Sequence, residues 1–267
     1  MSMDLKEMQQ IELGILNVVH QLCEKHKITY YLGFGTMLGA VRHGGFIPWD
    51  DDIDIMMPRE DYERFLKIAA VELESPFRLK CPGNTKPYLY DFAKVEDTRT
   101  KIIETVYSYV DTDNCIYIDI FPVDGCPSSA LLRNLHLRHV ELWQQLLAMY
   151  YSDLDKPRSA WKNVIIKFVK KHFSQDVLNQ HIEKLMKKYP FSSSPYAGYY
   201  EGKIHELVPK NFWGTPTRIK FEEQAFWGVE KAEEYLTALY GDYMKLPPED
   251  ERGGHTHSLV EWRCLNK

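Results

Sequence analysis

The sequence predicts an α+β protein, in which a core built on a mixed β-sheet carries flanking helices and a helical insertion or lobe. Short runs rich in β-branched and aromatic residues alternate with helical patterns in the first half of the chain. Near residue 128 the pattern becomes helical. We therefore expect a core over residues 1–127, a helical insertion over 128–200, and a C-terminal segment over 201–267 that packs back on the core.

The core is expected to begin with an amphipathic helix between Asp4 and Lys27, where apolar residues recur at steps of three and four. The segment Ile28–Phe34 is rich in β-branched and aromatic residues, so we expect a strand that runs into a tight turn at Gly33–Thr36. A short helix should follow over Met37–Arg42.

A mostly buried strand is predicted over Ile53–Met57, because apolar residues continue until Pro58 ends the run. The segment Arg59–Ala70 has the period of a helix. Further strand character occurs at residues 77–81, 88–95, 101–107 and 115–121, with turn residues between them. These strands should complete a mixed sheet.

The rest of the chain is predicted to be mainly helical. Helices are expected over Leu131–Tyr150 and Trp161–Tyr189, with a loop at Phe191–Pro195. A last helical stretch is expected over Phe221–Tyr240. No apolar run is long enough to span a membrane, and the N-terminus lacks the pattern of a secretion signal, so we expect a cytoplasmic protein.

Composition disfavours two classes of partner. The net charge of -5 provides no field that would attract nucleic acid, so we expect no nucleic-acid partner. The 5 cysteines are scattered and never form a Cys-x-x-Cys pair, which favours reduced thiols over a disulfide framework or a zinc knuckle.

The most informative segment contains four carboxylates, Asp50, Asp51, Asp52 and Asp54, at the start of the strand expected to be buried. Residues two apart on a strand project to the same side, so Asp52 and Asp54 should lie together. Carboxylates this close repel one another unless a divalent cation neutralises them, and Mg²⁺ prefers carboxylate and phosphate oxygens. We therefore predict a Mg²⁺ site here, with Mn²⁺ as an alternative ion.

A third acid, Asp119, is flanked by apolar residues and should project from a neighbouring core strand. Asp124 is the rival for this role. The alternative of a calcium-binding EF-hand loop is disfavoured, because the glycine and the glutamate that such a loop requires are missing at the corresponding positions.

The turn at Gly35-Thr36, followed by a short helix, would present backbone N–H groups and a hydroxyl to a phosphate beside the acidic strand. Glycines at turns usually serve backbone geometry alone, so this signal is weak by itself. Its position ahead of the Asp52-Ile53-Asp54 strand makes the combination specific.

In this order, Gly35-Thr36, Asp52-Ile53-Asp54 and Asp119 resemble the pattern of the nucleotidyltransferase superfamily, although Thr36 stands where that superfamily often has serine or glycine. More narrowly, GTMLGAVRH from Gly35 and FIPWDDDID from Phe46 resemble the LicD family of phosphocholine transferases, whose core fukutin-related ribitol-phosphate transferases share. The resemblance continues at residues 119–125, 240–244 and 246–249, and it does not cover residues 130–200.

The resemblance implies a nucleotidyltransferase-like catalytic core and a Mg²⁺-dependent phosphotransferase. Its donor would be CDP-choline, and its acceptor a sugar hydroxyl of a lipid-linked or other glycan precursor of teichoic-acid or lipopolysaccharide type, with CMP released. Asp52, Asp54 and Asp119 would hold the metal and carry the reaction. Nucleotidyl transfer to a small acceptor and ribitol-phosphate transfer remain alternatives. A sensing module without activity is disfavoured, because all three acids are present.

Further candidates for substrate binding are cations and one aromatic residue near these motifs. Surface cations usually meet only solvent, and most aromatic side chains belong to the core. Choline is a quaternary ammonium that aromatic faces recognise, and Trp49 beside the acids is the first choice for that role. The candidates for phosphate contacts are Arg42, His43, Lys94 and Arg99, with Lys94 preferred.

Residues 161–173 combine aromatic and aliphatic residues with interspersed lysines, as interfacial helices do. A lipid-linked acceptor would make contact with the inner face of a membrane useful. Helices of this kind more commonly cover their own protein core, and we favour that interpretation.

Overall fold

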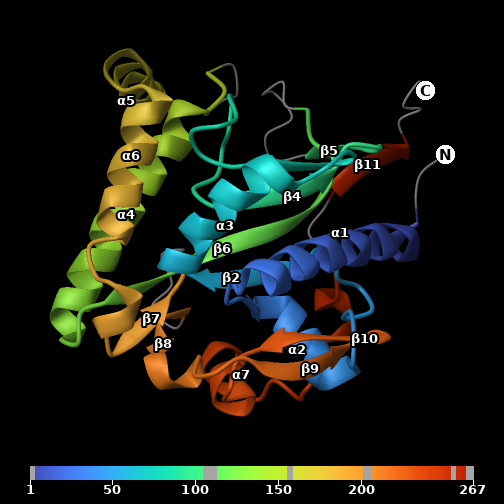
Figure 1. The fold of residues 1–267 in the computed structure, drawn as a ribbon. Coiled ribbons are helices and arrows are strands. Elements are labelled where there is room, and N and C mark those ends of the chain that lie inside the picture. Colours follow the sequence, from blue (N-terminus) through green and yellow to red (C-terminus); the bar gives the residue numbers. More distant parts are fainter. Residues whose placement is uncertain (1–3, 105–112, 155–158, 201–205, 254–256, 263–267) are drawn as a thin grey trace.

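The computed structural model describes residues 4–104, 113–154, 159–200, 206–253 and 257–262, and it confirms the predicted fold class. Helices pack around a mixed sheet, with the strand β6 at its centre (Figure 1). Among the described residues, no helix is both long and apolar enough to cross a membrane.

The central sheet has the strand order β1-β2-β6-β4-β3, and β7 and β8 extend it from β6. The pair β2 and β6 is parallel, whereas the other pairs are antiparallel, which makes the sheet mixed. Its strands are β1 (Tyr31–Leu32), β2 (Asp54–Pro58), β3 (Phe77–Lys80), β4 (Ala93–Asp97), β6 (Ile116–Cys126), β7 (Tyr196–Gly198) and β8 (Val208–Pro209).

Several strands differ from their predicted bounds, and β1 covers only Tyr31–Leu32 of the strand expected over Ile28–Phe34. β4 begins at Ala93 rather than at residue 88, and β6 continues to Cys126, where it pairs with β7. The strand β5 (Thr100–Glu104) pairs with β11 (His257–Trp262), while residues 105–107 of the predicted strand lie outside the described residues. The extension of β6 follows from tertiary pairing, because all of its residues are buried between neighbours.

The helix α1 (Leu5–His26) matches the predicted N-terminal helix. The Asp4 side chain caps it by accepting a 2.8 Å bond from the Glu7 N–H, and Lys27 ends it in a left-handed conformation. The buried side of α1 contacts β6 and β4 (Figure 1). This helix therefore lies along the two central strands.

The next two helices flank β2. The helix α2 (Phe34–His43) begins immediately after Gly33, earlier than the predicted Met37. The helix α3 (Arg59–Glu72) follows β2 directly, as predicted, and packs on β2, β6 and β3. The chain thus passes from the end of one helix through the acidic segment into a buried strand and then into another helix.

The single helix predicted over Trp161–Tyr189 is wrong, because the chain forms two helices, α5 (Ala160–His172) and α6 (Gln175–Met186). The backbone is extended at Phe173, and the Ser174 side chain then caps α6 by accepting a 3.3 Å bond from the Val177 N–H. The break lets both helices pack on α4 (Ala130–Tyr150), as the left side of Figure 1 shows.

The helical stretch predicted over Phe221–Tyr240 is also wrong for most of its length. The strands β9 (Thr217–Phe221) and β10 (Gln224–Gly228) form a hairpin, and only α7 (Ala232–Tyr240) is helical. Glu222 turns the hairpin with a φ of 55°. Both β9 and α7 contact α2, so this segment packs beside the acidic segment.

Short 3-10 turns occur at η1 (Phe191–Ser193), η3 (Lys210–Phe212) and η4 (Glu249–Glu251).

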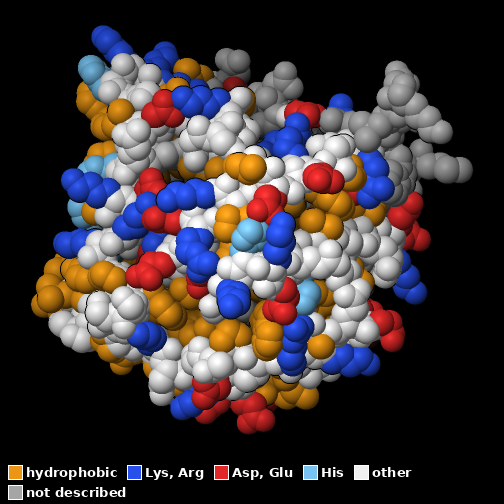
Figure 2. Space-filling model, in the orientation of Figure 1, with side chains coloured by type: hydrophobic (Ala, Val, Ile, Leu, Met, Phe, Trp, Pro, Cys, Tyr) orange, Lys and Arg blue, Asp and Glu red, His pale blue; other side chains and the backbone are white. Residues whose placement is uncertain are grey.

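The face drawn in Figure 2 carries basic and acidic side chains interspersed, with no broad patch of one sign. Apolar side chains gather at its lower left, where Figure 1 shows the start of α4. Leu131, Leu132 and Leu135 are exposed on that part of α4.

Candidate active site

A row of charged residues crosses the centre of the sheet. Asp54 on β2 lies in register with Asp119 on the parallel strand β6, and Asp119 lies in register with Lys94 on β4. In-register residues on neighbouring strands project to the same face. The structure therefore brings together three of the residues that the sequence singled out.

Lys94 is held firmly in this row, although it is only 4% exposed. Its Nζ lies 3.3 Å from Asp119 Oδ1 and also faces two aromatic rings, 3.3 Å from the Tyr117 centroid and 4.0 Å from the Tyr90 centroid. Attraction between the ammonium and the ring faces stabilises the buried charge. The ammonium is therefore directed at the acids.

The small-residue turn positions the start of β2. The Thr36 hydroxyl is buried and accepts a 2.8 Å hydrogen bond from the Asp54 N–H, while the Gly33 N–H donates a 2.9 Å bond to the Asp54 carbonyl. A side chain on Gly35 would lie 3.0 Å from Asp50 Oδ2. Glycine at this position lets the Asp50 carboxylate approach the first turn of α2 closely.

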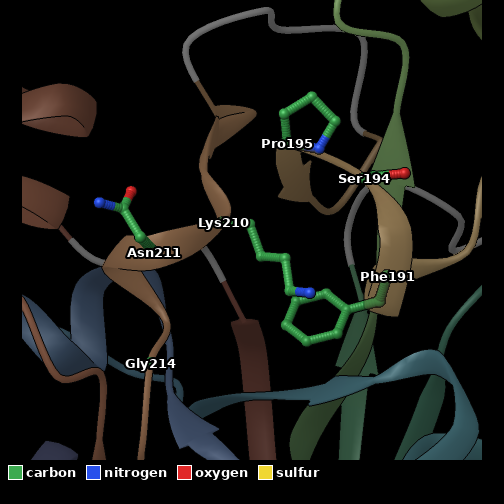
Figure 3. Close-up of a pocket in the computed structure, with 6 residues that line it drawn as sticks. All are labelled: Phe191, Ser194, Pro195, Lys210, Asn211 and Gly214. Carbon is green, nitrogen blue, oxygen red and sulfur yellow. The ribbon is translucent and has the colours of Figure 1, made fainter.

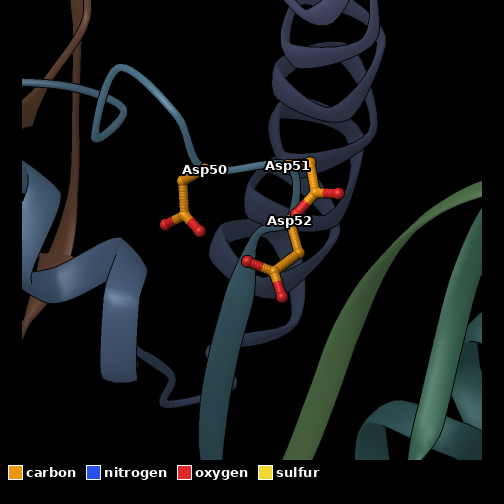
Figure 4. A group of neighbouring side chains, drawn as sticks. All are labelled: Asp50, Asp51 and Asp52. Atoms are coloured by element: carbon orange, nitrogen blue, oxygen red, sulfur yellow. The ribbon is translucent and has the colours of Figure 1, made fainter. Parts of the chain in front are cut away.

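The prediction that Asp52 lies on the same strand as Asp54 is wrong, because β2 begins at Asp54; Asp52 lies before the strand and groups with Asp50 and Asp51 (Figure 4). In the described part of the chain, Asp50, Asp51 and Asp52 can each offer an oxygen within 4.8 Å of the others. Burial, together with the charges of Asp52 and Asp51, raises the pKa of Asp50 to about 8. Such crowding of carboxylates is costly without a counter-ion.

Glu12 on α1 lies within the electrostatic reach of these acids and was not predicted from the sequence. Burial raises the pKa of Glu12 well above its ordinary value, and the charges of Asp52, Asp51, Asp50 and Asp119 raise it further. A sequence signal existed, because Glu12 falls on the buried side of α1 among Met8, Ile15 and Leu16. A carboxylate on an apolar helix face needs a partner.

Arg42, His43 and Trp49 lie beside the acidic segment. Arg42 Nη1 donates a 2.8 Å bond to the Tyr243 carbonyl. Burial lowers the pKa of Arg42, and the charge of Asp50 opposes this shift only in part. Burial also lowers the pKa of His43, whose ring lies edge-on to Trp49 at 6.3 Å. The Arg252 guanidinium lies 5.2 Å from the centre of the Trp49 ring.

The structure does not bring Arg99 to this group. Arg99 follows β4 and forms an ion pair with Asp97. Asp97 lies opposite Ile116, at the end of the β4–β6 ladder away from Lys94 and Asp119. Asp124, the rival third acid, is buried and accepts a 2.9 Å bond from Arg59 Nε. Of the two rivals, Asp119 is the one beside Asp54.

The residues present fit a hard divalent cation. Asp50, Asp51 and Asp52 form one group of carboxylates, and Asp54 and Asp119 lie side by side on neighbouring strands; carboxylate oxygens are the ligands that Mg²⁺ and Mn²⁺ prefer. In addition, Glu12 Oε2 is buried without a hydrogen-bond partner among the described residues. An orphaned buried acceptor beside an acidic cluster is satisfied when a cation binds.

A separate surface hollow of about 420 Å³ contains none of the predicted site residues (Figure 3). The Lys210 ammonium in it is already engaged by the Ser192 carbonyl and by the ring of Phe191. We assign this hollow no part in the site. Its lining residues are Phe191, Ser194, Pro195, Lys210, Asn211 and Gly214.

Comparison with known proteins identifies a family domain that includes the acidic segment, Lys94 and Asp119. A family model described as LicD/FKTN/FKRP, nucleotidyltransferase domain, matches residues 27–144. The chain is 32% identical over 260 residues to the lipopolysaccharide cholinephosphotransferase LicD of Haemophilus influenzae, across 94% of this chain and 95% of the relative.

Two shorter matches concern other relatives. The chain is 34% identical over 71 residues to the ribitol 5-phosphate transferase FKRP of Homo sapiens, across 27% of this chain and 13% of the relative. It is 41% identical over 66 residues to an uncharacterized protein of Rickettsia typhi, across 25% of this chain and 21% of the relative.

Proposed function

We infer the function of this chain from its family. The chain belongs to the LicD family and is an enzyme of the LicD type. We propose that it transfers phosphocholine to a glycan. The observation that carries this proposal is the similarity over nearly the full length of both chains to a lipopolysaccharide cholinephosphotransferase. The row formed by Asp54, Asp119 and Lys94 supplies charged groups suited to phosphoryl chemistry.

We propose CDP-choline as the donor. A sugar hydroxyl oxygen would bond to the phosphorus that bears choline, and the bond from that phosphorus to the bridging oxygen would break. CMP would leave, and the hydroxyl proton would pass to solvent or to a carboxylate of the site. Such transfers depend mainly on alignment and on compensation of the phosphate charge.

Asp52, Asp54 and Asp119 would hold Mg²⁺ or Mn²⁺, which when bound neutralises charge on the donor's phosphates. Lys94 would contribute a buried positive charge beside Asp119, and its fixed position between Tyr90 and Tyr117 favours a directed role. The turn at Gly35 and Thr36 would place the first N–H groups of α2 near the donor.

Trp49 is our candidate for recognition of choline. Its ring already attracts a cation, the Arg252 guanidinium at 5.2 Å, and it lies next to the acids. A trimethylammonium group would find the same attraction at this ring. Trp49→Ala should therefore impair turnover of CDP-choline more than turnover of a donor without a cationic end group.

The acceptor would be a sugar of a lipopolysaccharide or teichoic-acid precursor. The match to a lipopolysaccharide enzyme favours the first of these. We further propose that α5 contacts the inner face of a membrane that carries a lipid-linked acceptor. Trp161 and Phe168 are 62% and 57% exposed on α5, beside lysines suited to anionic lipid, whereas Ile166 and Val169 face the protein core.

A second candidate, transfer of ribitol phosphate, is favoured by the match over 71 residues to a ribitol 5-phosphate transferase. The two reactions share the metal site and differ in the group that the donor carries.

The deciding experiment measures CMP release from CDP-choline with Mg²⁺ and crude lipopolysaccharide precursor. We expect release by the wild-type chain, and its loss in the variant that combines Asp52→Asn and Asp54→Asn. Release from CDP-ribitol instead would replace the donor while keeping the site. Release of pyrophosphate from ATP would overturn phosphocholine transfer in favour of nucleotidyl transfer.

A further inference from the structure

Three phenylalanines form an aromatic row beside the charged row of the site, and the proposed reaction does not use them. Phe121 follows Asp119 by two residues on β6, so its ring lies on the face of the sheet that carries the acids. The Phe92 ring, directly before β4, lies 4.4 Å from the Phe121 ring between centres. The Phe34 ring, at the start of α2, meets Phe121 edge-on at 5.4 Å.

Phe34 is held in a strained backbone conformation. Its φ of 38° lies in the left-handed region, which glycine adopts freely and a bulky side chain rarely does. Its neighbours are Gly33 and Gly35, but the positive φ falls on the phenylalanine. Strained residues of this kind concentrate at catalytic and ligand-binding sites. The turn alone would favour glycine here, so the ring itself is what this position requires.

The aromatic row keeps accessible ring surface over a fixed support. Phe34 and Phe92 are half-buried, whereas Phe121 and Tyr199 are 8% and 3% exposed. Tyr199 packs on Phe121 at 4.7 Å, and its hydroxyl donates a hydrogen bond to the carboxylate of Asp91, which adjoins Phe92 in the chain. Supported rings with an accessible surface suit the stacking of a planar ligand.

The order of groups along β2 places this row relative to the acids. The acidic segment precedes β2, Asp54 begins the strand, and Met56 lies in register with Phe121. The aromatic row therefore lies about 7 Å beyond Asp54 along the strand, on the side away from the acidic segment. A donor whose phosphates meet the acids can extend to both sides of them.

Charge indicates which end of the donor meets which side. The Lys94 ammonium lies 5.6 Å from the centre of the Phe92 ring, so it would repel a trimethylammonium group at the aromatic row. The carboxylates of the acidic segment and the Trp49 ring would attract that group instead. An uncharged pyrimidine ring is not repelled by the ammonium, and it stacks on aromatic side chains.

We propose that the aromatic row binds the cytosine base of the donor, with Phe34 and Phe92 as the contacts. This inference rests on the proposed function, which supplies a cytidine nucleotide as the donor. Phe34 directly precedes Gly35 and Thr36, so it joins the base to the turn proposed to lie near the phosphates. Recognition of the donor thus divides between an acidic end for choline and an aromatic end for the base.

The test is calorimetric binding of CMP and of phosphocholine, the two halves of the donor, to the full-length chain with Mg²⁺. Phe34→Ala and Phe92→Ala should each weaken CMP binding at least about fivefold, the usual effect of losing one aromatic contact to a base. Phosphocholine binding should stay unchanged. Phe34→Tyr, which keeps the ring, should bind CMP like wild type.

Phe77→Ala is the matched control, because it removes a half-buried ring opposite Asp97, at the end of the β3–β4 ladder away from Lys94. It should leave CMP binding unchanged. In the CMP-release assay, Phe34→Ala and Phe92→Ala should raise KM for CDP-choline and leave kcat nearly unchanged, because the base is bound equally in the ground and transition states.

Unchanged CMP affinity in both Phe34→Ala and Phe92→Ala would overturn the proposal. Weaker binding of phosphocholine, with CMP binding retained, would also overturn it and assign the row to choline. If Phe34→Ala does not fold, Phe92→Ala decides. A wild-type chain that binds no CMP and releases none from CDP-choline would overturn the proposed donor as well, so the two failures are distinguishable.

Discussion

Asp119 and Asp124 lie on the same strand, β6, but meet different charges. Asp119 lies beside Asp54 and 3.3 Å from Lys94 Nζ, at the site proposed for the metal. Asp124 is buried against Arg59, whose pKa the charge of Asp124 raises despite burial. We therefore expect Asp119 to act in binding and Asp124 to act in stability.

Asp119→Asn should lower CMP release at least about 100-fold. Removal of a group that merely hydrogen-bonds a metal ligand already lowers activity by up to about 100-fold, and removal of the ligand itself should lower it at least as much. Asp124→Asn should instead lower the free energy of unfolding by about 3 kcal/mol, because Arg59 stays buried without its counter-charge. Urea unfolding and the CMP assay on both variants test this. A stable but inactive Asp124→Asn would reverse the assignment of the third acid.

Asp50 makes the stability of the metal-free protein depend on pH. Its pKa is raised to about 8, so the folded chain keeps a proton that the unfolded chain loses near about pH 4. The free energy of unfolding should therefore fall as pH rises from about 4 to about 8 in EDTA. Saturating Mg²⁺ should remove much of this decline, because the cation replaces the proton.

Urea unfolding at several pH values, with EDTA and with Mg²⁺, measures this difference. Asp50→Asn should flatten the profile in EDTA. A profile in EDTA that rises over this range would contradict a raised pKa at Asp50.

At the level of elements, the Thr36 hydroxyl joins α2 to the start of β2. Thr36→Val should lower the free energy of unfolding by about 1 to 3 kcal/mol, because the buried Asp54 N–H loses its acceptor. Thr36→Ser should restore both stability and activity. Chemical denaturation and CDP-choline kinetics separate the roles: an activity loss in Thr36→Val without a stability loss would favour direct contact with phosphate.

The helix α5 carries the proposed membrane contact. Trp161→Ala combined with Phe168→Ala should weaken binding to vesicles that contain anionic lipid at least about tenfold, because two large apolar side chains no longer enter the interface. Val71→Ala, at an exposed apolar residue on α3, is the control. Equal binding by wild type and the double variant in a co-sedimentation assay would contradict the membrane contact, and α5 would then serve only to pack on α4.

At the scale of the whole molecule, the acidic segment links α1, α2, β2 and β6, so bound cations should stabilise the entire fold. Mg²⁺ at about 100 times its Kd should add about 2.7 kcal/mol and raise Tm by roughly 5 °C or more. K⁺ at equal ionic strength is the control, and differential scanning fluorimetry is the measurement. A Tm that does not respond to Mg²⁺ would argue against metal binding by the folded state.

The described residues also place the cysteines: Cys23, Cys81, Cys115 and Cys126 are buried free thiols. For these four residues this agrees with the reduced thiols expected from their spacing, and Cys264 lies outside the described residues. The boundaries proposed for the three parts of the chain stay a prediction, and residues 128–200 contain α4, α5, α6 and β7.

By itself the sequence determined α1, β2, α3, α4, the fold class and the family, because helical period, apolar runs and the acid-x-acid motif are local patterns. It failed where local patterns compete with packing. The break at Phe173 depends on α4, and the hairpin of β9 and β10 depends on α2.

Only the tertiary structure decided which charged residues meet. The register of β2, β6 and β4 aligned Asp54 with Asp119 and Lys94, the start of α3 neutralised Asp124, and the docking of α1 turned Glu12 toward the acidic loop. Charges interact through space, whereas sequence patterns describe neighbours along the chain. The composition of the site was therefore partly visible in the sequence, and its electrostatic balance was not.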